Sequence, residues 1–147
     1  MPTQDEIRQM DGVALARLAW DLGLASEDVE PDTAGLLYWY QDAQDQHRWK
    51  MWFPHDNLAQ ADAVFRQLRA RGWSTFVIWA LGDYGGYDGE VEACPPPSLM
   101  HRGSIMVSFA TPDTEALALL RCACLAAASE GGDCWTQRRF AQWTGQP

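Results

Sequence analysis

Apolar residues recur along the chain at spacings that predict helices. Positions three and four residues apart are apolar over residues 4–24 and 57–71, which predicts two helices that each bury one face. Residues 112–129 are apolar on almost every side, which is typical of a central, heavily buried helix. A short terminal helix is predicted over residues 135–143.

Glycines and capping residues mark the predicted helix boundaries. Gly23 and Gly72 follow the first two apolar patterns, and glycine readily adopts the left-handed backbone that ends a helix. Asp56 is expected to cap the start of the second helix. Thr111 and Pro112 are expected to begin the third, as a cap followed by a proline in the first turn.

Shorter runs of aromatic and β-branched residues predict strands. The first two strands read as a hairpin with a polar turn of about six residues. The acidic residues 25–35 and the glycine-rich residues 82–89 are predicted to be loops. This order favours an α+β fold, as a three-layer α/β/α sandwich with a mainly antiparallel sheet. The predicted strands span residues 36–40, 48–53, 73–81, 90–93 and 104–110.

Length and composition predict a single globular domain over residues 1–147. With 47% hydrophobic and 21% charged residues, the composition excludes a disordered or fibrous chain. No apolar run approaches the ~20 residues of a membrane-spanning helix, and the first residues do not resemble a signal peptide. A cytoplasmic location without membrane contact is therefore expected.

The net charge of −9 is concentrated near the N-terminus, where the first fifty residues hold ten acidic and four basic side chains. A field of this sign repels phosphate groups, so direct binding of nucleic acid or anionic lipid is disfavoured. The same field favours a protein partner with a basic surface. Solubility alone is the simpler explanation of the charge.

The chain contains residue types that can act in catalysis or bind metals, but their spacing in the sequence matches no known catalytic or metal-binding motif. Cys122 and Cys124 lie about 200° apart around a predicted helix, so they are expected to be free thiols packed in the core. Cys94 and Cys134 are expected in loops. The glycine-rich segment lacks the lysine and the following helix of a phosphate-binding loop, and no nucleophile motif appears. The chain is therefore predicted to be no enzyme and to hold no cofactor and no metal.

Eight tryptophans are too many for complete burial in a core of this size. In the predicted hairpin, alternation places Trp49 and Met51 on one side and Lys50 and Trp52 on the other. One side is expected to pack in the core. The other would form either further packing or an aromatic surface for a partner.

Four stretches resemble the phage ABA sandwich domain, a small domain of bacteriophage and prophage proteins. The resemblance implies an α/β/α fold and a location in the cytoplasm of a host bacterium, and it brings no catalytic residues. The chain departs from the family pattern in an acidic insertion (25–47), a proline loop (95–97) and the extra C-terminal helix (135–143). The similar stretches lie within residues 5–129, at residues 11–20, 54–72, 104–109 and 111–125.

These features together favour a bacteriophage or prophage accessory protein that binds a host protein. The expected role is an acidic inhibitor of a host defence complex, in the manner of an anti-CRISPR protein, or of a nucleic-acid-processing complex. One alternative is a protein that sequesters a small molecule or nucleotide, with a pocket around Trp39, Trp79 and Tyr87. Another is a small metal-dependent enzyme. The candidate partner-binding residues are Glu27, Asp28, Glu30, Asp32, Trp39, Trp52, Asp83, Tyr84 and Tyr87.

Overall fold

A computed structural model of the chain describes residues 1–25, 29–32, 35–41, 44, 46–81 and 87–130. Residues 30–32, 35–41, 47, 80–81, 87 and 100–102 are described by their backbone only. None of the helices in these ranges has the length and apolar character needed to cross a membrane.

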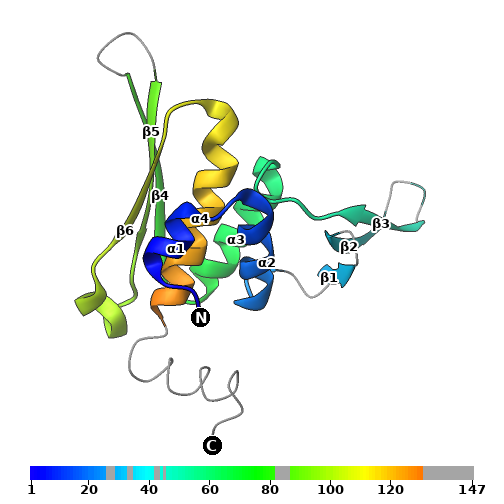
Figure 1. The fold of residues 1–147 in the computed structure, drawn as a ribbon, viewed down its shortest axis with the longest axis horizontal. Coiled ribbons are helices and arrows are strands. Elements are labelled where there is room, and N and C mark those ends of the chain that lie inside the picture. Colours follow the sequence, from blue (N-terminus) through cyan, green and yellow to red (C-terminus); the bar gives the residue numbers. More distant parts are fainter. Residues whose placement is uncertain (26–28, 33–34, 42–43, 45, 82–86, 131–147) are drawn as a thin grey trace, which may run out of the picture.

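The described residues form helices and two separate antiparallel sheets, which confirms the α+β class (Figure 1). The helices are α1 (Gln4–Gln9), α2 (Gly12–Asp21), α3 (Leu58–Ala70) and α4 (Glu115–Ser129), with short 3₁₀ helices η1 (Pro97–Arg102) and η2 (Pro112–Thr114). One sheet holds β1 (Val29–Asp32), β2 (Gly35–Gln41) and β3 (His47–Met51), in that order. The other holds β4 (Ser74–Leu81), β5 (Tyr87–Cys94) and β6 (Ile105–Phe109), also in chain order.

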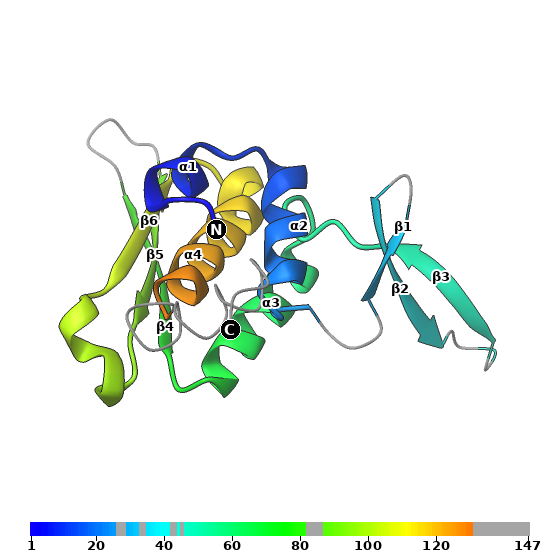
Figure 2. The same cartoon turned by 60° about the horizontal axis from the view of Figure 1, so that its bottom comes forward.

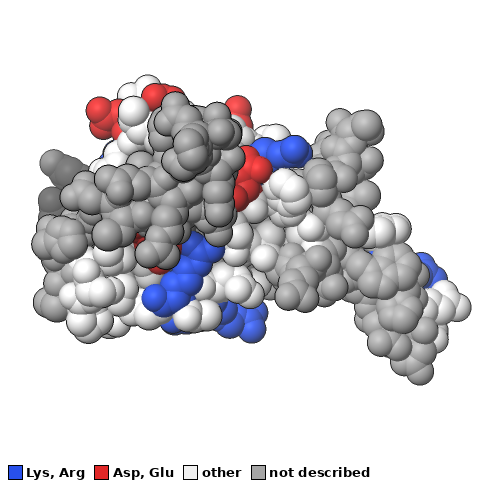
Figure 3. Space-filling view, turned by 90° about the horizontal axis from the view of Figure 1, so that it is seen from below, with Lys and Arg blue, Asp and Glu red and all other residues white. Residues whose placement is uncertain are grey.

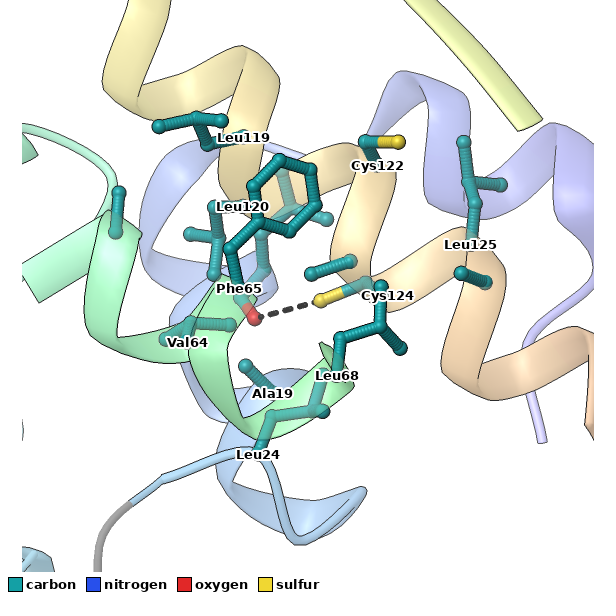
Figure 4. Packing of buried hydrophobic residues seen from close by; sticks show 14 of the residues in the cluster. Ala19, Leu24, Val64, Phe65, Leu68, Leu119, Leu120, Cys122, Cys124 and Leu125 are labelled. Atoms are coloured by element: carbon teal, nitrogen blue, oxygen red, sulfur yellow. Dashed lines mark hydrogen bonds between the residues drawn. The ribbon is translucent and has the colours of Figure 1, made fainter. Parts of the chain in front are cut away.

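Helix α4 lies at the centre of the molecule, as its apolar sequence predicts. It packs against β5 and β6 on one side and against α1, α2 and α3 on the others. Residues 122–127 of α4 are fully buried. The thiol of Cys124 lies beside Phe65 and Leu68 of α3 (Figure 4). Cys122 and Cys124 are free, so their predicted role as core thiols is confirmed.

The sheet β4–β6 meets the helices with one face. Val91 and Ala93 of β5 and Val107 of β6 are buried on that side. In Figures 1 and 2 all the described α-helices lie on this side of the sheet. A sandwich with helices on both faces is therefore not confirmed.

The sheet β1–β3 extends from the opposite side of the helices as an arm (Figure 2). Its β2–β3 pair is the predicted hairpin, in which Trp39 stands opposite Trp49. The predicted loop over residues 25–35 is wrong for its second half, because Val29–Asp32 form strand β1 and pair with β2. Strand β1 is an edge strand, where proline and charged residues are tolerated.

The predicted helix over residues 4–24 is two helices. The helical backbone is interrupted at Asp11, whose side chain accepts a hydrogen bond from the amide of Ala14 at 2.8 Å and so caps the start of α2. Gly12 is thus the first residue of α2 rather than a weak point within one helix. The predicted stop at Gly23 is confirmed: its φ is 75°, and the amide of Leu24 donates back to the carbonyl of Ala19 at 2.9 Å.

Helix α3 begins one residue later than predicted. Its cap is Asn57, whose Oδ1 accepts from the amide of Gln60 at 2.9 Å, and not Asp56. The predicted stop at Gly72, with a φ of 96°, is confirmed. Cys94, predicted in a loop, is the last residue of β5. The predicted helix over residues 135–143 and Cys134 lie outside the described residues.

Candidate functional site

The arm β1–β3 is fastened to the helices at both of its ends. At the start of β1, the indole Nε1 of Trp20 donates to the carbonyl of Val29 at 3.0 Å. At the end of β3, the side chain of Gln60 bridges the backbone, because its Oε1 accepts from the amide of Phe53 at 2.7 Å and its Nε2 donates to the carbonyl of Met51 at 3.2 Å. Gln60 is 8% exposed, so these hydrogen bonds are shielded from water. These hydrogen bonds therefore fix the backbone at the two points where the arm joins the helices.

Strand pairing places aromatic and acidic positions on one face of the arm, which we call the arm face. Trp39 stands opposite Trp49, and Leu37 stands opposite both Met51 and Glu30. Because residues directly opposite in an antiparallel pair share a face, and alternate residues of a strand do too, Asp32 belongs to the same face. The arm face consists of the positions Glu30, Asp32, Leu37, Trp39, Trp49 and Met51.

Trp49 and Met51 show that the arm face is open to solvent at β3. Their exposed fractions are 49% and 46%. Large apolar side chains exposed side by side are unusual on a monomer surface and mark interaction sites more often than isolated ones do. The arm face is the candidate interaction surface of the chain.

Trp52 does not belong to an exposed surface. It is 7% exposed and lies in the core. Trp52 follows the end of β3, so it enters the helical body rather than continuing the alternation of the arm. The expectation that its ring faces a partner is therefore corrected.

The structure describes the backbone of only some of the other predicted partner-binding residues. Glu30, Asp32 and Trp39 occupy the arm face by register, while Tyr87 begins β5 in the other sheet. Four further candidates lie outside the described residues, namely Glu27, Asp28, Asp83 and Tyr84.

A second exposed apolar surface was not anticipated from the sequence. Strand β4 exposes four consecutive residues, with fractions of 51% for Phe76, 42% for Val77, 49% for Ile78 and 38% for Trp79. The strand was predicted, but its position at the edge of the sheet was not. The sequence from Ser74 to Leu81 contains no charged residue, and this was the feature that could have indicated an exposed apolar strand.

The predicted pocket around Trp39, Trp79 and Tyr87 is not formed. Strand β2 carries Trp39 in the arm, whereas β4 and β5 lie on the other side of the helices in both views. A hollow of about 470 Å³ lies elsewhere, at the end of the β4–β6 sheet, beside Ile78, Gly89 and Phe109. Asp88 and Glu90 also line it, and two carboxylates disfavour an anionic ligand.

The described residues contain no group of three or more His, Cys, Asp and Glu side chains that could hold a metal ion. The ring of His55 serves packing: it covers Gly12, where a Cβ atom would lie 2.6 Å from the imidazole carbons. Burial raises the pKa of the Cys122 thiol to about 12 and raises that of Cys124 further, so neither is a ready nucleophile.

Acidic and basic side chains are mixed on the described surface. Seen from below, basic residues cross the middle of the molecule, and acidic ones lie both at its upper edge and beside the basic ones (Figure 3).

No family model, curated protein or solved structure matches this chain.

Proposed function

We propose that the chain is an accessory protein that acts by binding another protein through the arm face. The observation that carries this proposal is the register of the arm, which groups the acidic positions Glu30 and Asp32 with Trp39 and the exposed Trp49 and Met51. Aromatic side chains supply most of the affinity at protein interfaces, and complementary charge supplies association rate and specificity.

The partner that suits this surface is a protein with a basic channel or groove. Glu27 and Asp28 immediately precede β1, so four acidic residues occur within six positions of the sequence. Such a segment competes with nucleic acid for a basic surface, because both present closely spaced negative charges. The proposed role is therefore inhibition of a nucleic-acid-processing or host defence complex, and the resemblance to phage ABA sandwich domains supports a phage or prophage context.

We also propose that the fold is a three-layer α/β/α sandwich, with helices on both faces of the β4–β6 sheet. In an α/β/α sandwich a second helical layer would cover the open face of β4–β6, where Phe76, Ile78 and Met106 are exposed. Burial of these three side chains would remove apolar surface from water, which favours such a layer.

A matched pair of charge-reversal variants tests the proposed function. Changing Glu27, Asp28, Glu30 and Asp32 to lysine is expected to abolish capture of a salt-sensitive partner from bacterial lysate. The control variant changes Asp5, Asp21, Asp88 and Asp113 to lysine, which alters the net charge equally at exposed positions outside the arm. Equal loss in both variants, or no loss in the first, would contradict recognition by the arm.

A small-molecule function is a second candidate because of the hollow beside Gly89. Its carboxylates favour a cationic ligand over the nucleotide first considered. Trp79 does not line this hollow, but its ring contacts Phe109, which does, so its fluorescence should report a bound ligand. A library of small amines that leaves the tryptophan emission unchanged would remove this candidate.

A further inference from the structure

Strand β4 is an edge strand without the features that normally prevent edge pairing. Among the described residues it pairs with β5 only, so its outer backbone groups face away from the sheet. Natural edge strands are commonly protected by lysine, proline, a bulge or a covering element. Ser74–Leu81 contain no charged residue, proline or glycine, and the four residues at its centre are exposed on both faces.

The opposite edge of the same sheet is protected. Strand β6 shows regular alternation, with Ile105, Val107 and Phe109 buried and the residues between them exposed. The guanidinium of Arg8 in α1 also donates to the backbone carbonyl of Met106 at 3.3 Å. The two edges therefore differ in burial and covering, although neither strand contains a charged residue or proline, and β4 is the edge that can accept another strand.

We propose that β4 pairs with β4 of a second copy of this chain, in antiparallel orientation about a two-fold axis near Val77. Such an axis, perpendicular to the sheet, reverses the strand direction and keeps each face of the sheet on its own side. Phe76 of one copy then stands opposite Ile78 of the other, and Thr75 stands opposite Trp79. The two sheets join into one antiparallel sheet of six strands.

Charge complementarity selects a second copy as the occupant of this edge. A groove of about 590 Å³ runs along the inner side of β4, between β4, α3 and α4. Arg69 lies beside the first half of β4, where its Nη1 donates to the hydroxyl of Thr75 at 2.9 Å and its Nη2 is 3.9 Å from Oδ1 of Asp62, which also lines the groove. Glu115 lines the groove from the start of α4, which follows β6 at the end of the sheet where Phe109 meets Trp79.

A two-fold axis near Val77 exchanges the two ends of this groove. It therefore brings the Arg69 side chain of each copy toward Glu115 of the other. A second copy of the chain supplies a partner of opposite charge to both Arg69 and Glu115, whereas an uncharged extended peptide supplies none. The pairing is independent of the arm face, so it can fail without affecting the proposed partner binding.

The direct measurement is the mass of the full chain in solution by sedimentation equilibrium, from low to high micromolar concentration. The expected result is a reversible rise from the mass of one 16.5 kDa chain to that of two. The double variant Phe76→Lys/Ile78→Lys places like charges opposite one another and should remain monomeric. The variant Met106→Lys, equally exposed on the protected edge, should still form the dimer.

A charge-swap mixture separates loss of pairing from loss of folding. Phe76→Glu/Ile78→Glu should also be monomeric alone, yet it should form a heterodimer when mixed with Phe76→Lys/Ile78→Lys, because each lysine then meets a glutamate. Likewise, Arg69→Glu should weaken the dimer and Arg69→Glu/Glu115→Arg should restore it. A wild-type chain that stays monomeric throughout, or two folded variants that do not combine, would overturn the proposal.

Discussion

The ring of Phe109 meets the ring of Trp79 edge to face, with centroids 4.5 Å apart and planes at 87°. The two residues lie on the outer strands of the β4–β6 sheet, and Gly89 of β5 stands between them in the register. A Cβ atom at Gly89 would lie 2.2 Å from Cζ of Phe109. Glycine at this position therefore allows the two outer strands to share an aromatic contact across the middle one.

Replacing Gly89 by alanine should destabilise the fold because the new methyl group overlaps the ring of Phe109. We expect a loss of about 1–3 kcal/mol in the free energy of unfolding, measured by urea denaturation. The double variant Gly89→Ala/Phe109→Leu supplies the control, since it makes room for the methyl group. It should lose less stability than the sum of its two single variants. Strictly additive losses would contradict the steric explanation.

A second prediction concerns the contact between the ends of α3 and α4. Nη1 of Arg71 and Oε1 of Glu130 are 2.8 Å apart, and the indole of Trp73 donates to Oε2 of Glu130 at 3.2 Å. The side chain of Glu130 is only 12% exposed. We expect Glu130→Ala to reduce the free energy of unfolding by about 2 kcal/mol, because charged hydrogen bonds are lost in a shielded place.

The exposed pair of Asp62 and Arg66 provides the matched control for Glu130. These two side chains are 3.4 Å apart but 52% and 64% exposed. Asp62→Ala should change the free energy of unfolding by about 0.5 kcal/mol or less, since water screens the pair. If Glu130→Ala and Asp62→Ala lower the free energy of unfolding equally, burial of Glu130 does not strengthen its contacts with Arg71 and Trp73.

Local features of the chain predicted much of this fold. The helix stops at Gly23 and Gly72 followed from backbone chemistry alone, and the burial of α4 followed from its apolar sequence. Strand β1 was missed because Glu30, Pro31 and Asp32 have low strand propensity, and only pairing with β2 at a sheet edge makes them a strand. Local patterns carry no information about such a partner.

The candidate surfaces were harder to predict than the fold. The aromatic hairpin was identified, but Trp52 was assigned to the exposed set because alternation was extended beyond the end of β3. The exposure of Phe76 to Trp79 depends on strand order, which places β4 at an edge. Strand order is a property of the whole sheet, so the sequence of β4 alone predicts the strand and not its surroundings.

Trp49 in the arm and Trp52 just beyond its end should separate binding from folding. Trp52→Ala should reduce the free energy of unfolding by about 3–5 kcal/mol, because it leaves a large cavity in the core. Trp49→Ala should change it by less than about 1 kcal/mol, because the ring is 49% exposed. Partner capture should nevertheless fall with Trp49→Ala. If capture is unchanged while the variant is folded, the arm face is not the binding surface.

The last prediction concerns stability at alkaline pH. Burial raises the pKa of Cys122 from the usual 9.0 to about 12 and raises that of Cys124 further. Above pH 9 the unfolded chain loses these thiol protons, while the folded chain keeps them. Unfolding then releases protons, so the stability that is fully present below pH 9 declines as pH rises toward 12.

We expect each thiol to contribute a decline of about 1.4 kcal/mol per pH unit in that window. Urea denaturation at pH 8, 9 and 10 should show a steeper loss for the wild type than for Cys122→Ala/Cys124→Ala. The double variant is less stable throughout, because Cys122 and Cys124 are fully buried, so the comparison rests on the slopes rather than on the absolute values. Identical slopes would show that both thiols ionise equally in the folded and unfolded chain, and would contradict a pKa rise caused by burial.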